Sequence, residues 1–158
     1  MDILNHPLIA QRYFFPQRGR LAQPFLVETP AGPLACWRSA APSERPILVH
    51  FHGNGELVEH WIHGFAPFIE ACGFDVFLAE YRGYGDSAGT PTLGSLLDDI
   101  PHIAAALGVE PSQTVVFGRS VGSIFAVEWV RRFGDCRGLI LESGIHDVFQ
   151  RLALRIGP

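Results

Sequence analysis

An alternation of short apolar runs with longer helical stretches most strongly constrains how this chain can fold. The apolar runs have the composition of strands buried on both faces and span residues 47–51, 74–80, 114–117 and 138–142. Stretches with helical character follow them at residues 56–72, 95–107, 123–133 and 146–156. Strands that alternate with helices predict a parallel sheet with right-handed crossovers. We therefore expect an α/β fold with helices flanking a mostly parallel sheet.

The length of 158 residues predicts a single domain, residues 1–158, in three parts. Residues 1–23 look like an irregular arm with aromatic anchors. Residues 24–45 predict a β-hairpin and a loop, with strands at 25–28 and 34–37 joined across the turn-rich link 30–33. Residues 46–158 hold the parallel αβ units.

Charge and cysteine content exclude several classes of protein. The net charge of −4 disfavours nucleic acid or an anionic membrane as a partner. No apolar run approaches the length of a membrane span, and the first ten residues lack the basic start of a signal peptide. Cys36, Cys72 and Cys136 are few and widely spaced, which argues against a disulfide framework and favours reduced thiols in a cytoplasmic protein.

The segment Gly118-Arg119-Ser120-Val121-Gly122 has the pattern G-x-S-x-G and joins a predicted strand to a predicted helix. This is the setting of a nucleophile elbow, in which a strained turn exposes a serine hydroxyl. Glycines flank the serine because a side chain at Gly118 or Gly122 would collide across the turn. The pattern therefore makes Ser120 a candidate catalytic nucleophile.

Three loops follow the carboxyl ends of predicted strands, where open α/β sheets bind ligands. They span residues 50–55, 81–87 and 118–122. Their order and spacing resemble the α/β-hydrolase fold, and more closely its serine-hydrolase branch with a short His-Gly-Asn oxyanion loop. The resemblance covers roughly residues 20–157.

This resemblance implies roles for three residues. Ser120 would be the nucleophile, and the backbone N–H groups of Asn54 and Val121 would form the oxyanion hole. The implied reaction is hydrolysis of a small carboxylic ester, or of an amide or thioester, through an acyl-enzyme on Ser120. No cofactor and no metal are implied.

The chain departs from the family pattern after the fourth parallel run. In this fold the acid and then the histidine follow later strands, so both are expected beyond Pro158. The truncated sheet would leave residues 138–142 with an open edge, which predicts a homo-oligomer or a missing C-terminal half. The alternative from another class is a non-catalytic fragment or interaction module that associates through that edge.

The chain also offers candidates of its own for the missing triad members. Glu142 or Asp147 is conceivable as the acid, because some hydrolases of this fold place the acid after this strand. His146 lies beside them, but as a base it would need unusual geometry. Arg119, a charged residue next to the nucleophile, is interpreted as having a positional role.

Four histidines raise the question of a metal site: His50, His52, His60 and His63. The sequence after His52 does not fit a metallohydrolase pattern, so we expect His52 to order the oxyanion loop and the others to be surface or helix residues. Gly83-x-Gly85-x-x-Ala88 formally matches a dinucleotide fingerprint, but no helix follows at once, so a loop with Arg82 bonded to Asp86 is expected.

Aromatic residues at helical spacing, Trp61, Phe65 and Phe68, are expected to belong to the core rather than to a substrate pocket.

Overall fold

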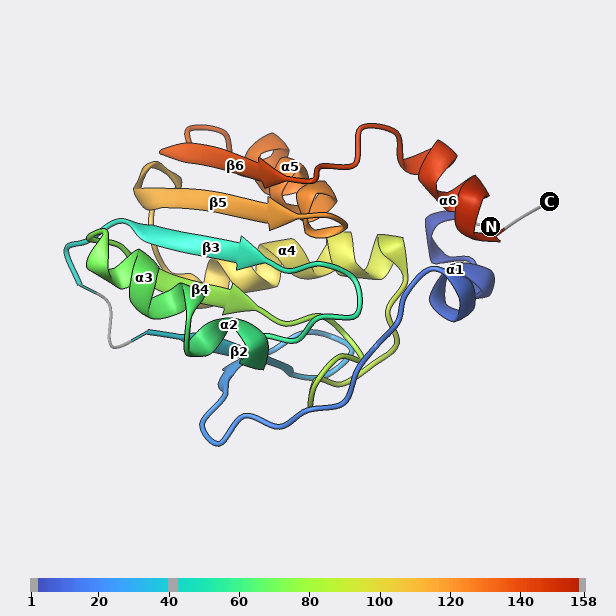
Figure 1. The fold of residues 1–158 in the computed structure, drawn as a ribbon, viewed down its shortest axis with the longest axis horizontal. Helices are drawn as coiled ribbons and strands as arrows, with labels where there is room; N and C mark the ends of the chain where they lie inside the picture. The colour runs from blue at the N-terminus through green and yellow to red at the C-terminus, as the bar shows by residue number, and fades with distance from the viewer. Residues whose placement is uncertain (1–2, 40–42, 157–158) are drawn as a thin grey trace.

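A computed structural model describes residues 3–39 and 43–156. Residues 1–2, 40–42 and 157–158, which belong to the predicted arm, loop and C-terminal unit, lie outside the described residues. A six-stranded sheet forms the centre, in the order β1-β2-β4-β3-β5-β6. Helices cover both of its faces, with α2 and α3 on one and α4 and α5 on the other (Figure 1). The predicted α/β class with a mostly parallel sheet is confirmed.

The predicted hairpin is present as β1 (Phe25–Val27) and β2 (Leu34–Arg38). The two strands pair antiparallel, with Val27 opposite Leu34. The turn between them is closed by Thr29, whose hydroxyl donates to the Gly32 carbonyl at 2.7 Å. Strand β2 also pairs antiparallel with β4, which attaches the hairpin to the edge of the parallel sheet.

Four parallel strands carry the loops that matter for function: β3 (Ile47–Phe51), β4 (Asp75–Ala79), β5 (Thr114–Arg119) and β6 (Gly138–Glu142). Every residue of β3 is buried, since helices pack on both faces of this central strand. All four strands point toward the side of the molecule where α1 and α6 lie (Figure 1). Their carboxyl ends therefore meet at one edge of the sheet.

The single helix expected over residues 56–72 is instead two short helices, α2 (Glu59–Ile62) and α3 (Phe65–Ala71). Pro67 supplies the physical reason, because a proline clashes with the carbonyl four residues earlier in a continuous helix. That carbonyl belongs to His63, and the break falls at His63 and Gly64. Near the start of α3 the missing proline N–H costs nothing.

Helix α4 (Leu93–Leu107) begins earlier than residue 95. Thr92 is its N-cap, and its hydroxyl accepts from the Ser95 N–H at 3.2 Å. The Ser95 hydroxyl accepts in return from the Thr92 N–H at 3.0 Å. A serine thus takes the place that glutamate or glutamine usually holds in a capping box, and the helix begins before the residue 95 expected from the sequence.

The N-terminal arm was expected to be irregular, but it contains a 3-10 turn (Ile3–Asn5) and helix α1 (Pro7–Arg12). Pro7 is favourable at the first helical position, and the His6 Nδ1 accepts a hydrogen bond from the Leu8 N–H. Two of the expected aromatic anchors, Tyr13 and Phe14, are buried. Helix α1 packs against α6 (Val148–Ile156), although the two are far apart in the sequence (Figure 1).

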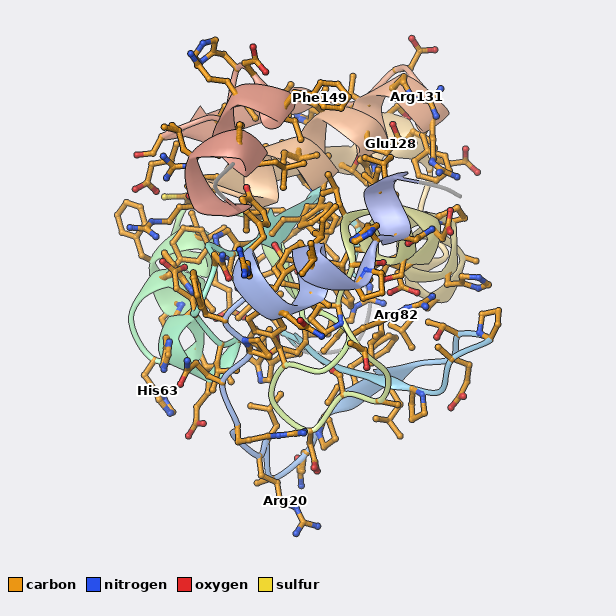
Figure 2. The ribbon with its side chains drawn as sticks, turned by 90° about the vertical axis from the view of Figure 1, so that its right-hand side faces the viewer. Arg20, His63, Arg82, Glu128, Arg131 and Phe149 are labelled. Carbon is orange, nitrogen blue, oxygen red and sulfur yellow. The ribbon has the colours of Figure 1, made fainter. Side chains whose placement is uncertain are left out.

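Strand β6 differs from the other parallel strands because its side chains are exposed. Leu139, Ile140 and Leu141 are 41%, 45% and 46% exposed, and among the described residues β6 pairs only with β5. Phe149 of α6 is 67% exposed and lies on the same upper part of the molecule (Figure 2). The sheet therefore has an open apolar edge at the expected place.

Within the described ranges, no helix combines the length and the apolar character that crossing a bilayer requires.

Candidate active site

Ser120 lies in a sharp turn between β5 and α5 (Gly122–Phe133). Its φ of 52° is in the left-handed region, which costs a non-glycine residue about 1–3 kcal/mol. A Cβ on Gly118 would lie 2.5 Å from the Gly122 carbonyl oxygen, and one on Gly122 would lie 2.0 Å from the Phe51 oxygen. The predicted collision across the turn is confirmed for Gly118, whereas a side chain at Gly122 would collide with the end of β3.

The strained turn is held by hydrogen bonds from the neighbouring strand and helix. The Ser120 N–H donates to the Glu142 carbonyl at 2.8 Å. The Ser123 hydroxyl donates to the Ser120 carbonyl at 2.6 Å and accepts from the Ile145 N–H at 2.9 Å. Ser123 is 2% exposed, so this bridge fixes the elbow to the loop after β6 from inside the protein.

His52 orders the loop after β3, which was the expected role. Its ring is fully buried, with Nε2 2.7 Å from Glu80 Oε1 and Nδ1 2.8 Å from the Gly53 carbonyl. Each ring nitrogen therefore lies within hydrogen-bond distance of a protein oxygen, which fixes the orientation of the ring. The Glu80 carboxylate also accepts from the Val58 and Tyr81 N–H groups, both at 3.1 Å.

The Asn54 side chain is bonded to the N-terminal arm. Its Nδ2 donates to the Tyr13 carbonyl at 2.5 Å, and its Oδ1 accepts from the Phe15 N–H at 2.9 Å. The Tyr84 hydroxyl donates to the same oxygen at 2.7 Å. Burial raises the pKa of that hydroxyl, which keeps it protonated as the donor. These bonds leave the backbone N–H as the group that Asn54 can offer a ligand.

Two cavities open beside Ser120. The inner cavity, of about 130 Å³, is lined by Ser120 and six other residues: Tyr13, Phe15, Asn54, Val121, Ile145 and Arg151. The outer cavity, of about 270 Å³, is also lined by Ser120, with residues of α6 and the preceding loop. The structure thus brings together Ser120, Asn54 and Val121, which the sequence placed in two separate loops.

Three polar groups of residues that line the inner cavity have no hydrogen-bond partner within residues 3–39 and 43–156. They are the Ser120 hydroxyl and the backbone N–H groups of Asn54 and Val121. Val121 is 1% exposed, so its N–H is shielded from bulk water. A hydroxyl beside two free N–H donors is the arrangement in which a carbonyl under attack gains stabilisation for its developing negative charge.

Arg119 has the positional role expected for it. Its guanidinium bonds Glu56 through NH1 and Glu142 through Nε, the latter at 3.1 Å. The Glu56 carboxylate in turn accepts from the Gly53 N–H at 2.9 Å. This network ties the elbow, the loop after β3 and the end of β6 together.

Both candidates for the acid have other partners. Glu142 bonds Arg119, and Asp147 accepts from the Gln150 N–H at 2.8 Å in the first turn of α6. His146 and Asp147 do line the outer cavity with Ser120, but in the described part of the chain no hydrogen bond joins His146 to Ser120.

The expected bond between Arg82 and Asp86 is wrong. Arg82 forms a bidentate pair with Asp99 of α4, with both distances 2.6 Å, and Asp86 faces Arg20 at 3.7 Å. Asp99 is buried and Asp86 is exposed, so the arginine neutralises the carboxylate that water cannot reach.

His50 is buried rather than at the surface, which corrects the expectation for this residue. Its ring lies among Trp61, Phe65 and Phe117, with centroids 4.4–5.1 Å apart. Burial, with the charges of His52 and Arg119, lowers the pKa of His50 to about 3, so the ring is neutral. Across the described ranges, no group of three or more His, Cys, Asp or Glu side chains is arranged to hold a metal ion.

The expected core aromatics are divided. Trp61 and Phe65 pack against buried residues, whereas Phe68 is 66% exposed. None of the three is among the residues that line the two cavities at Ser120.

Sequence reasoning missed the contributions of Tyr13, Phe15, Tyr84 and Arg151 to the site. Tyr84 lies in a loop that the sequence did mark, but its partner Asn54 is 30 residues away. Tyr13 and Phe15 contribute backbone groups, which any residue could supply, so no sequence signal identifies them.

Comparison with known proteins agrees with the fold. A family model described as serine aminopeptidase, S33, matches residues 42–156. The chain therefore belongs to the α/β-hydrolase superfamily, and within it to this family. Among curated relatives, YfhR of Escherichia coli, an uncharacterized protein, is 34% identical over 64% of this chain and 37% of its own length. The human alpha/beta hydrolase domain-containing protein 17C is 33% identical over 65% of this chain and 32% of its own length.

Solved structures show the same fold. An N-acyl homoserine lactonase, AidH, aligns with a TM-score of 0.66 at 22% identity, over 86% of this chain and 51% of that protein. An esterase from Exiguobacterium antarcticum aligns with a TM-score of 0.61 at 19% identity, over 75% of this chain and 44% of that protein. The matched region is thus about a third of the relatives' length and about half of these structures.

Proposed function

We propose that this protein is a serine hydrolase that acts on carboxylic esters, with amides and thioesters as related substrates. Ser120 attacks the carbonyl carbon, and the N–H groups of Asn54 and Val121 bind the oxyanion. An acyl-enzyme forms on Ser120 as the alcohol leaves, and water then releases the acid. The observation that carries the proposal is the inner cavity, where a strained serine lies with two unpaired backbone donors.

Names of the structural neighbours support the substrate class. One neighbour is named as an esterase and another as a lactonase, and a lactone is a cyclic carboxylic ester. The family description, serine aminopeptidase, supports amides as the related class. The free thiols Cys36, Cys72 and Cys136 favour a reducing compartment, and we place the protein in the cytoplasm on that ground.

The acid and base that activate Ser120 are proposed to come from polypeptide beyond the described residues. Glu142 and Asp147 are engaged elsewhere, which supports this assignment. Without a base, a serine hydroxyl is a weak nucleophile at neutral pH. A histidine from further sequence or from a second chain would approach Ser120 from the outer cavity.

Labelling with a fluorophosphonate probe, followed by intact mass, tests the proposal. The wild-type protein, in the full polypeptide or assembly that supplies the acid and the base, is expected to gain one label, and Ser120→Ala is expected to lose it. Ser143→Ala is the matched control, because Ser143 also has a positive φ and lines the outer cavity. Equal labelling of wild type and Ser120→Ala would contradict the assignment, as would loss of the label in Ser143→Ala alone.

A second candidate function is association through the open edge of β6, either with a second copy or with a missing C-terminal half. Unpaired strand edges with apolar side chains promote pairing with another chain, and Leu139, Ile140 and Leu141 supply those side chains. Light scattering after size-exclusion chromatography should show a concentration-dependent dimer that Ile140→Lys removes. Leu26→Lys, on the opposite edge strand and 53% exposed, should leave the dimer intact. A monomer at every concentration would contradict self-association.

A further inference from the structure

We propose that Arg151 forms an anion-binding subsite beside Ser120, which selects esters that carry a carboxylate near the bond to be cleaved. The inference rests on the proposed hydrolase function and names its substrate class. Arg151 lies on α6, which packs against α1 above the carboxyl ends of the strands (Figure 1). It lines both cavities that contain Ser120.

Among the described residues that line the inner cavity, Arg151 is the only one with a formal charge. The others are the aromatic Tyr13 and Phe15, the apolar Val121 and Ile145, and the polar Asn54 and Ser120. The molecule as a whole carries a net charge of −4, which repels anions in general. A cation beside the nucleophile therefore favours an anionic group at the place where substrate is proposed to bind.

The guanidinium of Arg151 is available to a ligand. Within the described residues it forms no ion pair or side-chain hydrogen bond, in contrast to Arg82 and Arg119, which each hold a carboxylate. Asp147 lies one helical turn before Arg151, but its carboxylate accepts from the Gln150 N–H at 2.8 Å. Of these two cavities Asp147 lines only the outer one, so no carboxylate is found among the described residues that line the inner one.

A carboxylate is the ligand that best matches this group. The planar guanidinium presents paired N–H donors that bind both oxygens of a carboxylate, and such charge-assisted bonds are roughly twice as strong as neutral ones. If Arg151 instead assisted the oxyanion, it would favour neutral and anionic esters alike. Discrimination between the two ester types is therefore the property that identifies the subsite.

The test measures binding rather than turnover, in the Ser120→Ala background so that the esters remain intact. Calorimetric titration compares monomethyl succinate, glutarate and adipate, which carry a carboxylate, with their neutral dimethyl esters. We expect at least one monomethyl ester to bind more tightly than its dimethyl counterpart, and Arg151→Gln to weaken it roughly tenfold. The preference should also weaken in high salt.

Arg45→Gln is the matched control, because Arg45 is also exposed and unpaired among the described side chains but precedes β3, at the opposite end of the sheet. It should leave binding unchanged. Binding that Arg151→Gln leaves unchanged, or no binding of any monomethyl ester, overturns the inference. Fluorophosphonate labelling is scored separately. If Ser120 is labelled but Arg151→Gln leaves ester binding unchanged, the subsite is refuted and the hydrolase function is not. If Ser120 is never labelled but Arg151→Gln weakens ester binding, the hydrolase function is refuted and the subsite is supported.

Discussion

Replacing Gly122 by alanine tests the packing that holds the elbow. The added Cβ would lie 2.0 Å from the Phe51 carbonyl oxygen and 2.8 Å from the His52 carbonyl oxygen. Both atoms are backbone at the end of β3, so no side-chain rotation relieves the contact. Because Cβ atoms essentially never approach closer than 3.0 Å, β3 and α5 must separate by about 1 Å.

The expected cost follows from that displacement. Overpacking a close-packed interior typically costs 1–3 kcal/mol, and a clash with rigid backbone on two sides belongs at the upper end, about 3 kcal/mol. In a chain of this size, 1 kcal/mol lowers the melting temperature by roughly 3 °C, so a decrease of about 10 °C is expected. Urea unfolding should show a lower midpoint with an unchanged slope.

Gly64→Ala provides the control. A Cβ at Gly64 meets nothing within 4 Å, and its φ of −114° suits any residue, so stability should change by less than about 0.5 kcal/mol. Labelling of Ser120 should fall in Gly122→Ala, since Val121 and Ser120 adjoin the displaced residue, and should persist in Gly64→Ala. An unfolding midpoint for Gly122→Ala equal to that of Gly64→Ala would refute the packing argument.

Two further predictions concern buried polar groups. Glu80→Gln removes the charge partner of His52 in a fully buried pair and should destabilise the protein by about 3 kcal/mol in urea unfolding; a midpoint equal to wild type would show that the pair is dispensable. The pKa of His50 is lowered to about 3 in the folded state. Between pH 6.5 and 3, His50 therefore binds a proton in the unfolded chain but not in the folded one. The free energy of unfolding consequently falls as the pH falls through this range, by up to about 1.4 kcal/mol per pH unit. His50→Leu should flatten this part of the profile, and an identical profile would contradict the assignment.

Local signals in the sequence predicted the strands and the elbow because the physics that sets them is local. A strained turn between a strand and a helix needs glycine at positions 118 and 122, and both requirements are visible in five consecutive letters. The start of α4 was expected too late, at residue 95, because its capping box joins Thr92 to a serine, Ser95, where glutamate or glutamine is usual.

Contacts over long sequence separation were not predictable in this way. Arg82 could have paired with the nearby Asp86, but its partner is Asp99. The fold buries Asp99 and leaves Asp86 exposed to water. Asn54 meets Tyr84 and the arm only after three segments have come together. The hydrogen-bond partners around the elbow therefore depend on which carboxylates and amides the fold buries. Burial is set by the packing of segments that are far apart in the sequence.

The open edge of β6 and the geometry at Ser120 are physically linked. The strained backbone of Ser120 costs about 1–3 kcal/mol, and hydrogen bonds worth about 1 kcal/mol each offset it. One of these bonds runs directly to the Glu142 carbonyl at the end of β6, and another passes through Ser123 to the loop that follows. Because β6 pairs with a single described neighbour, these anchors lie on an edge strand of the sheet. Whatever polypeptide covers β6 would therefore also stabilise the turn that presents the nucleophile.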